Sequence, residues 1–134
     1  MQVTLFLCDA AQEMGGKLYI LGGGWSQLHT PDTPTSMALA VLIKQPWDQA
    51  NQKHSFNAVL MTDDGDQVTI DEQEVSAIGE WETGRPAGLK PGVDLDVPVA
   101  LTFNGVVLPA GGYRWEFFID GTQMAVAPFR VIGD

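Results

Sequence analysis

The sequence is poor in the residues that metal sites and covalent catalysis need. Its 134 residues include one cysteine, Cys8, and two histidines, His29 and His54. One cysteine excludes an intramolecular disulfide, and three residues so far apart do not have the spacing of a zinc site. The carboxylate of Asp9, beside Cys8, disfavours the thiolate that a cysteine nucleophile requires. We therefore expect Cys8 to be a small buried side chain, and we predict no cofactor and no metal.

Other catalytic motifs are missing as well. None of the four serines lies in the sharp strand-to-helix turn typical of a serine nucleophile. The glycines at 22–24 lack the spacing and the following helix of a phosphate-binding loop, and they indicate a bulge or a change of direction instead. We predict no catalytic residues and a protein that is not an enzyme. The alternative, a small-ligand binder or an enzyme whose site is assembled from distant residues, stays open.

Positive charge is scarce, with 7 Lys and Arg against 17 Asp and Glu and a net charge of −10. Such a balance repels phosphate backbones, so we predict no nucleic-acid partner. Eight acidic residues lie between positions 63 and 82 with no Lys or Arg among them, which indicates a solvated edge or a surface for a basic partner or a cation. Calcium is the candidate cation, through the clustered carboxylates of Asp63, Asp64 and Asp66, with Asp94 and Asp96 approaching from another loop.

Long apolar runs are also absent. No stretch approaches the ~20 residues of a membrane helix, and the first twenty residues lack the basic start of a signal peptide. We expect no membrane association and a cytoplasmic protein, or a virion protein if the chain is phage-encoded. The length and the 45% hydrophobic content fit one globular domain over residues 1–134.

The pattern that is present has period two, which is typical of β-strands. We predict an all-β fold, an antiparallel, immunoglobulin-like β-sandwich with seven to nine strands and little helix. A segment apolar on both faces, 37–44, indicates a central strand. Single helical turns are expected at most at 9–14 and 47–53, and residues 71–94 are read as one weak edge strand and a long loop. The remaining strands are expected at 3–8, 17–21, 54–61, 67–70, 97–103, 113–119 and 124–132.

Four tryptophans fall into two groups. Trp115 lies within a strongly alternating strand, and we predict that it belongs to the core. Trp25, Trp47 and Trp81 lie beside predicted turns, where a tryptophan either caps the packing or anchors an interface. We predict these three as interaction residues for a protein partner or for self-association.

Several short segments resemble an uncharacterised family of short bacterial proteins. They are LFLCDAA at 5–11, GKLYILGGG at 16–24, PWD at 46–48, DDG at 63–65, LPxGxYxWxF at 108–117, IDG at 119–121 and PFRV at 128–131. The likeness spans nearly the whole chain and implies a bacterial or phage origin and a compact β domain, without an activity or functional residues. The C-terminal hairpin is also similar to those of immunoglobulin-like modules.

These observations favour a non-enzymatic binding or interaction module that presents loops or an apolar face to a protein. The alternative is a structural component of a phage virion, such as a capsid decoration or a tail-associated protein. The sequence contains no motif that decides between them.

Overall fold

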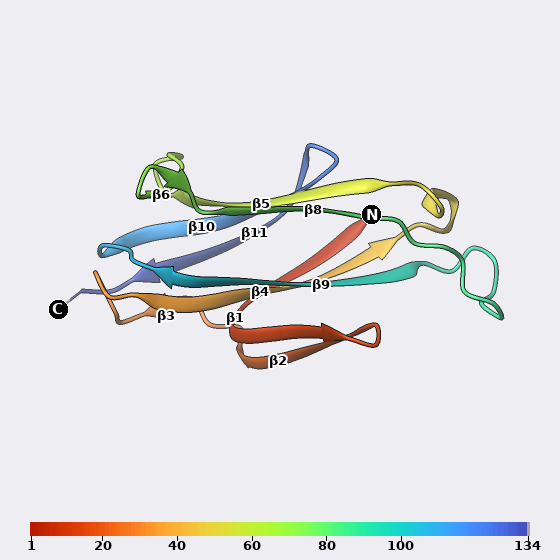
Figure 1. Ribbon diagram of the computed structural model, residues 1–134, viewed down its shortest axis with the longest axis horizontal. Coiled ribbons are helices and arrows are strands. Elements are labelled where there is room, and N and C mark those ends of the chain that lie inside the picture. The colour runs from red at the N-terminus through yellow and green to blue at the C-terminus, as the bar shows by residue number, and fades with distance from the viewer. Residues whose placement is uncertain (134) are drawn as a thin grey trace.

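The computed structural model describes residues 1–133, which form two packed β-sheets (Figure 1). One sheet has the strand order β2-β1-β4-β9, the other has the order β3-β11-β10-β5-β8, and β6 and β7 form a separate two-stranded ribbon. The strands are β1 (Gln2–Met14), β2 (Lys17–Gly23), β3 (Gln27–Leu28), β4 (Thr35–Gln45), β5 (His54–Thr62), β6 (Thr69–Ile70), β7 (Gln73–Glu74), β8 (Ser76–Trp81), β9 (Leu95–Val106), β10 (Gly111–Ile119) and β11 (Thr122–Val131).

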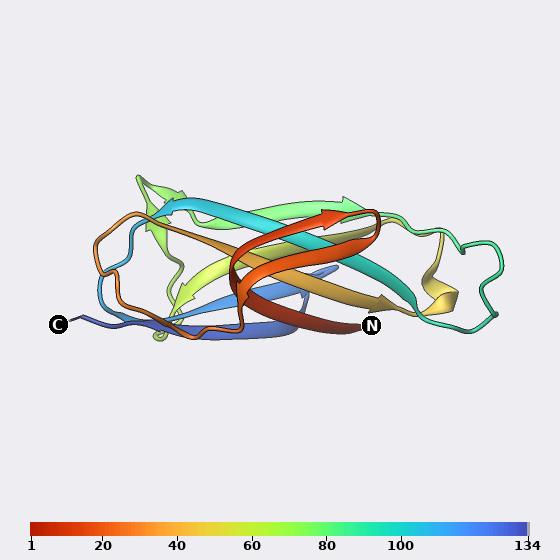
Figure 2. The same cartoon turned by 90° about the horizontal axis from the view of Figure 1, so that it is seen from below.

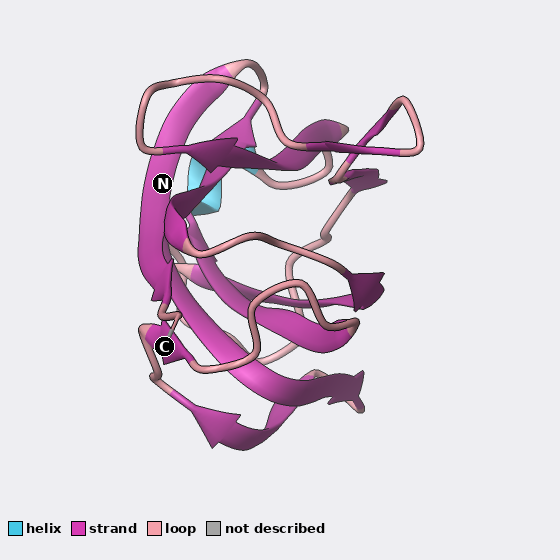
Figure 3. Cartoon of the chain, turned by 90° about the vertical axis from the view of Figure 1, so that its left-hand side faces the viewer, coloured by secondary structure: helices cyan, strands magenta, loops and turns pink. Residues whose placement is uncertain are grey.

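The predicted all-β sandwich is confirmed. Within residues 1–133, eight strands have six or more residues and three have two. Of the three short strands, β6 lies within the strand predicted at 67–70, whereas β3 and β7 were not predicted because two residues leave no alternation to detect. All strand pairs are antiparallel except β3 with β11. The only helix in this part of the chain is η1 (Trp47–Gln49), inside the segment predicted to make one turn (Figure 3).

The core lies between the two sheets and follows the alternation of the sequence. Trp115 and Phe117 of β10 are fully buried, as predicted for Trp115. Across the core, the ring of Phe103 on β9 lies 4.3 Å from the Trp115 ring, centroid to centroid. The inward residues of β4, from Met37 to Ile43, complete the same cluster. Two sheets facing each other thus bury both alternating sets.

The other face of β4 is covered by the β1–β2 hairpin, which crosses β4 and β9 on the side away from the core (Figure 2). Ala38 and Ala40 of β4 and Cys8 of β1 are fully buried there, with Ala11 and Leu18 of the hairpin packed against them. These small side chains let the hairpin approach the sheet closely. The segment predicted as apolar on both faces is therefore central, between β1 and β9, and buried on both faces.

One local prediction was wrong. Residues 9–14, where a helical turn was expected, continue β1 as strand and pair with β2. The cause is the turn that follows, because Gly15 and Gly16 have φ of 59° and 78°. Positive φ at both central residues gives the two-residue turn whose twist matches that of a hairpin. Strand pairing then outweighs the weak helical tendency of the polar segment.

The acidic stretch is largely as predicted. Residues 71–94 contain one edge strand, β8, and a long loop from 82 to 94, with the short strand β7 as an addition. Within the described chain, no helix has the length and apolar character needed to cross a membrane.

Candidate functional site

Two of the acidic residues predicted as a cation site, Asp63 and Asp96, have other partners. The Asp63 carboxylate lies 3.2 Å from Nη2 of Arg130 and occupies the space above Gly112, where a Cβ would overlap it. Asp96 forms an ion pair with Lys44. Among residues 1–133, no three Asp, Glu, His or Cys side chains are grouped so that they could hold a metal ion. The structure therefore does not bring the predicted carboxylates together.

The tryptophans predicted as interaction residues are half-buried and lie in separate places. Trp25 packs edge-on against Phe129, with ring centroids 6.0 Å apart. Trp47, at the start of η1, lies under the guanidinium of Arg85, 4.7 Å from its ring centroid, and its carbonyl accepts a 2.9 Å hydrogen bond from Arg85 Nη2. Trp81, at the end of β8, belongs to a polar cluster. Their packing contacts are evident, and their role as interface anchors stays a prediction.

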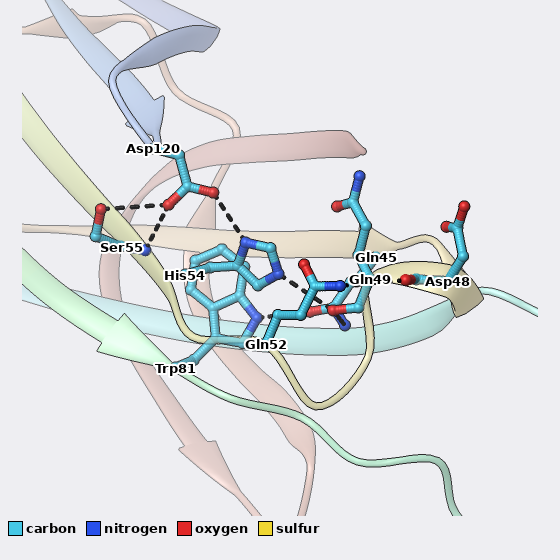
Figure 4. Close-up of polar contacts among 8 residues, drawn as sticks. All are labelled: Gln45, Asp48, Gln49, Gln52, His54, Ser55, Trp81 and Asp120. Carbon is cyan, nitrogen blue, oxygen red and sulfur yellow. Dashed lines mark hydrogen bonds and ion pairs between the residues drawn. The ribbon is translucent and has the colours of Figure 1, made fainter.

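That polar cluster is centred on His54, which is buried (Figure 4). Its Nδ1 lies 2.8 Å from Oδ2 of Asp120, and its Nε2 lies 3.2 Å from the carbonyl oxygen of Gln49. The Trp81 ring stacks on the imidazole at 5.2 Å, and Trp81 Nε1 donates a 2.7 Å hydrogen bond to Oε1 of the fully buried Gln45. The Gln45 amide in turn donates to the Gln49 carbonyl. The cluster thus joins β4, η1, β5, β8 and the β10–β11 turn.

Serine, histidine and aspartate meet here without the contacts of a catalytic triad. Ser55 donates its backbone N–H and its hydroxyl to Oδ1 of Asp120, at 2.9 and 3.4 Å, and the hydroxyl does not face His54. These bonds, first the backbone one and then the bond from His54, hold the pKa of Asp120 below its usual value. A triad needs the serine hydroxyl bonded to the histidine. The cluster therefore links five elements at one end of the sandwich without the serine–histidine contact of a triad.

The cysteine is placed as expected. Cys8 is fully buried, and its thiol donates a 3.4 Å hydrogen bond to the Ala38 carbonyl. Burial first, and then the charge of Asp9, raise the pKa of the Cys8 thiol. A buried thiol with a raised pKa is an inert packing group.

A hollow of about 620 Å³ lies between the 82–94 loop and the adjacent ends of β1, β4 and β9. Its lining includes Leu89, Val93, Asp94 and Lys44, and Lys44 is already paired with Asp96. A built small-molecule site has a few polar groups that converge on one point. This hollow is lined by a mixture of apolar and charged side chains, and its polar groups do not converge on one point.

The most distinctive surface is the outward side of the β1–β2 hairpin. We call Met14, Tyr19 and Leu21 the hairpin surface, and their side chains are 59%, 54% and 71% exposed. Beside Tyr19 and Leu21 lies a hollow of about 300 Å³ floored by Ala10 and Ala11. Adjacent large apolar side chains in water mark interaction sites more often than isolated ones do.

The hairpin carries less net charge than the molecule as a whole. The paired residues of the hairpin, 8–23, contain two acidic residues, Asp9 and Glu13, and one basic residue, Lys17, whereas the whole chain has a net charge of −10. The hairpin surface is therefore an apolar region of low charge on an acidic protein. The sequence held a signal for it, because residues 18–21 are apolar on both faces in the same way as most of 37–44, and only the latter segment was interpreted as a central strand.

Comparison with known proteins identifies the family. No curated protein matches this chain. A family model described as a family of unknown function, DUF6941, matches residues 3–132, which confirms the resemblance seen in the short segments. The chain belongs to the DUF6941 family.

Proposed function

We propose that this domain is a non-enzymatic interaction module that binds a protein partner through the hairpin surface. The observation that carries the proposal is the exposure of Met14, Tyr19 and Leu21 side by side on a hairpin of low charge. Large apolar and aromatic side chains of this kind supply most of the binding energy of protein interfaces.

The hairpin is held in place before any partner arrives. Its inward side packs Ala11 and Leu18 onto the cluster of Cys8, Ala38 and Ala40, and beyond β2 the Gly24 N–H donates a 2.7 Å hydrogen bond to the Leu7 carbonyl. A surface already fixed in its bound form loses less conformational entropy on binding. This rigidity supports a docking role for the outward side.

We also propose that the sandwich is immunoglobulin-like, which places the hairpin on a common binding scaffold. Support comes from the sheet that contains β11, β10, β5 and β8 opposite the one that contains β1, β4 and β9. Further support is Tyr113 at the start of β10, whose hydroxyl donates a 2.7 Å hydrogen bond to the Pro109 carbonyl, as in the tyrosine corner of such domains. This scaffold hosts many functions, so the proposal for binding still depends on the surface itself.

The polar cluster agrees with a binding role. His54 has an oxygen acceptor opposite each ring nitrogen, and Asp120 accepts bonds from Ser55 and His54. The imidazole of His54 is buried and already engaged on both sides, so it is poorly placed to act on a substrate.

The test is affinity capture of the tagged protein from the native host, read by quantitative mass spectrometry. Wild type is compared with Leu21→Lys, which charges the hairpin surface, and with Ile78→Lys, which changes an 83% exposed apolar residue on β8. We expect a stoichiometric partner that Leu21→Lys loses and Ile78→Lys keeps. A capsid or tail protein as the partner would identify a virion component. A partner retained by Leu21→Lys would reject the hairpin surface as the binding site.

A further inference from the structure

The outermost strands of the two large sheets differ in how they resist pairing with another molecule. A strand edge with free backbone groups invites a further strand, and proteins guard such edges with charge, proline or shortness. The outermost strand β9 contains Pro98 and Asp96, β8 contains Glu80, and β3 has two residues. By contrast β2 has seven residues, no proline and no acid, and its one charge is Lys17 at the first position.

The register of the hairpin shows which backbone groups of β2 face outward. Met14 and Lys17 flank the two-residue turn and are directly paired, so they form the hydrogen-bonded pair that closes the hairpin. Bonded and non-bonded pairs alternate along an antiparallel ladder. Residues 17, 19 and 21 therefore bond to β1, whereas Leu18 and Ile20 direct their N–H and C=O groups to the open edge.

We propose that a second copy of this chain pairs with β2, antiparallel and with the two-fold axis at Ile20. This inference rests on the proposed function and names the partner of the hairpin. In this register Ile20 faces its own counterpart as a hydrogen-bonded pair, and Leu18 faces Gly22 of the other copy. Tyr19 then lies opposite Leu21 in the close, non-bonded positions of the ladder.

The side chains of β2 favour a second copy over an unrelated strand. Tyr19 and Leu21 are exposed on the same face and become each other's cross-strand neighbours twice, once on each side of the axis. An aromatic residue opposite an aliphatic one is a stabilising cross-strand pair. Lys17 lies opposite Gly23, so the two lysines stay apart. The Asp9 carboxylate of β1 lies against Gly22, next to the contact. The strand is thus complementary to itself in the pairing of Tyr19 with Leu21.

The size of the contact and the charge of each copy determine the expected affinity of the dimer. A seven-residue strand spans about 24 Å, so the contact falls at the small end of specific interfaces. Each copy brings a net charge of −10, and salt screens repulsion between exposed charges. We expect a weak dimer that becomes tighter as the salt concentration rises.

Sedimentation equilibrium tests the dimer directly. The apparent mass is expected to rise from 14.5 kDa toward twice that value with protein concentration, and to rise further when the salt concentration is increased. Tyr19→Lys and Leu21→Lys are expected to raise the dissociation constant about tenfold or more, because a two-fold interface contains each substitution twice. Ile78→Lys is the control and should change nothing. A wild-type chain that remains a monomer up to about 1 mM in high salt would overturn the proposal.

Disulfide trapping tests the register. Paired residues of the bonded type have Cα atoms about 5.5 Å apart, within the range a disulfide spans, so Ile20→Cys is expected to cross-link on mild oxidation. The native Cys8 is buried and does not compete. In Lys17→Cys the two thiols would be about 20 Å apart along the ladder, and cross-linking as fast as in Ile20→Cys would overturn the register. Thermal melts of both variants serve as the control that each is folded.

The two proposals fail differently. If the protein is monomeric but Leu21→Lys abolishes capture of another protein, the second copy is the wrong occupant and the interaction module stands. If the chain neither self-associates nor loses any partner on Leu21→Lys, both proposals are wrong.

Discussion

Trp115 connects the two sheets, and its removal gives the sharpest test of the packing. The side chain is fully buried and lies against Phe103 of the opposite sheet. Truncation to alanine removes the transfer free energy of the ring and leaves a cavity, at a cost of about 3–5 kcal/mol. For a chain of this length each kcal/mol corresponds to roughly 3–5 °C in Tm. We therefore expect Trp115→Ala to melt about 10–20 °C below wild type.

The assay is urea unfolding followed by circular dichroism, together with a thermal melt. Val126→Ala is the matched control, because Val126 lies on the neighbouring strand β11 and is 41% exposed, and exposed substitutions change stability by about 0.5 kcal/mol or less. If Trp115→Ala cost no more than Val126→Ala, the placement of this ring in the core would be refuted.

Trp115→Phe separates ring packing from the polar indole. The Trp115 Nε1 is buried and has no hydrogen-bond partner within residues 1–133, and an unsatisfied buried donor costs about 1–3 kcal/mol. Phenylalanine keeps an aromatic ring against Phe103 and removes that donor. We expect it to lose less than half of the stability lost by Trp115→Ala. Equal losses of stability in Trp115→Phe and Trp115→Ala would contradict this separation of ring packing from the buried indole N–H.

Three further predictions follow from single contacts. Gly112→Ala should lower the free energy of unfolding in urea by about 1 kcal/mol or less, because its Cβ would displace the exposed Asp63 carboxylate and weaken its ion pair with Arg130; a loss of several kcal/mol would contradict this reading of the contact. The pKa of Asp120 is lowered from 3.8 in the folded state, so the stability that its carboxylate contributes is present above about pH 4 and is lost as the pH falls through the pKa of the folded protein. Below pH 4 the free energy of unfolding of Asp120→Asn should then change less with pH than that of wild type. An equal pH dependence of the two proteins would contradict this role of Asp120. The Cys8 thiol should resist a thiol reagent in the native protein and react at once in urea, since it is fully buried; rapid labelling of the native chain would show that the hairpin opens.

The strand framework could be predicted from the sequence because alternation reports local geometry. Residues 113–119 place Tyr113, Trp115 and Phe117 on one face, and the structure buries all three. The β1–β2 hairpin was only half predicted. The strand at 17–21 was found, but its partner at 9–14 carries alanines and polar residues whose pattern shows no clear period. The two glycines of the turn determine that residues 9–14 form a strand, and a two-residue turn predicts a hairpin more strongly than the composition of the preceding strand does.

Contacts between distant residues were beyond the sequence. His54 and Asp120 are 66 positions apart, and Gln45 and Trp81 are 36 apart, yet each pair forms a hydrogen bond. Their meeting depends on the strand order, which no local pattern contains. The prediction of a cation site was incomplete for the same reason. Proximity in sequence suggested a site at Asp63, whereas the fold places Arg130 beside that residue.

The distribution of charge distinguishes the hairpin edge from the other sheet edges. A net charge of −10 keeps copies of a protein apart, and the acids lie on or next to strands such as β8 and β9 that would otherwise offer open edges. Among these outermost strands, β2 has seven residues without an acid or a proline, and it exposes Tyr19 and Leu21. We therefore expect association at that edge. Restoring protection there, with a lysine in place of Leu21, should therefore remove binding without changing the stability of the sandwich.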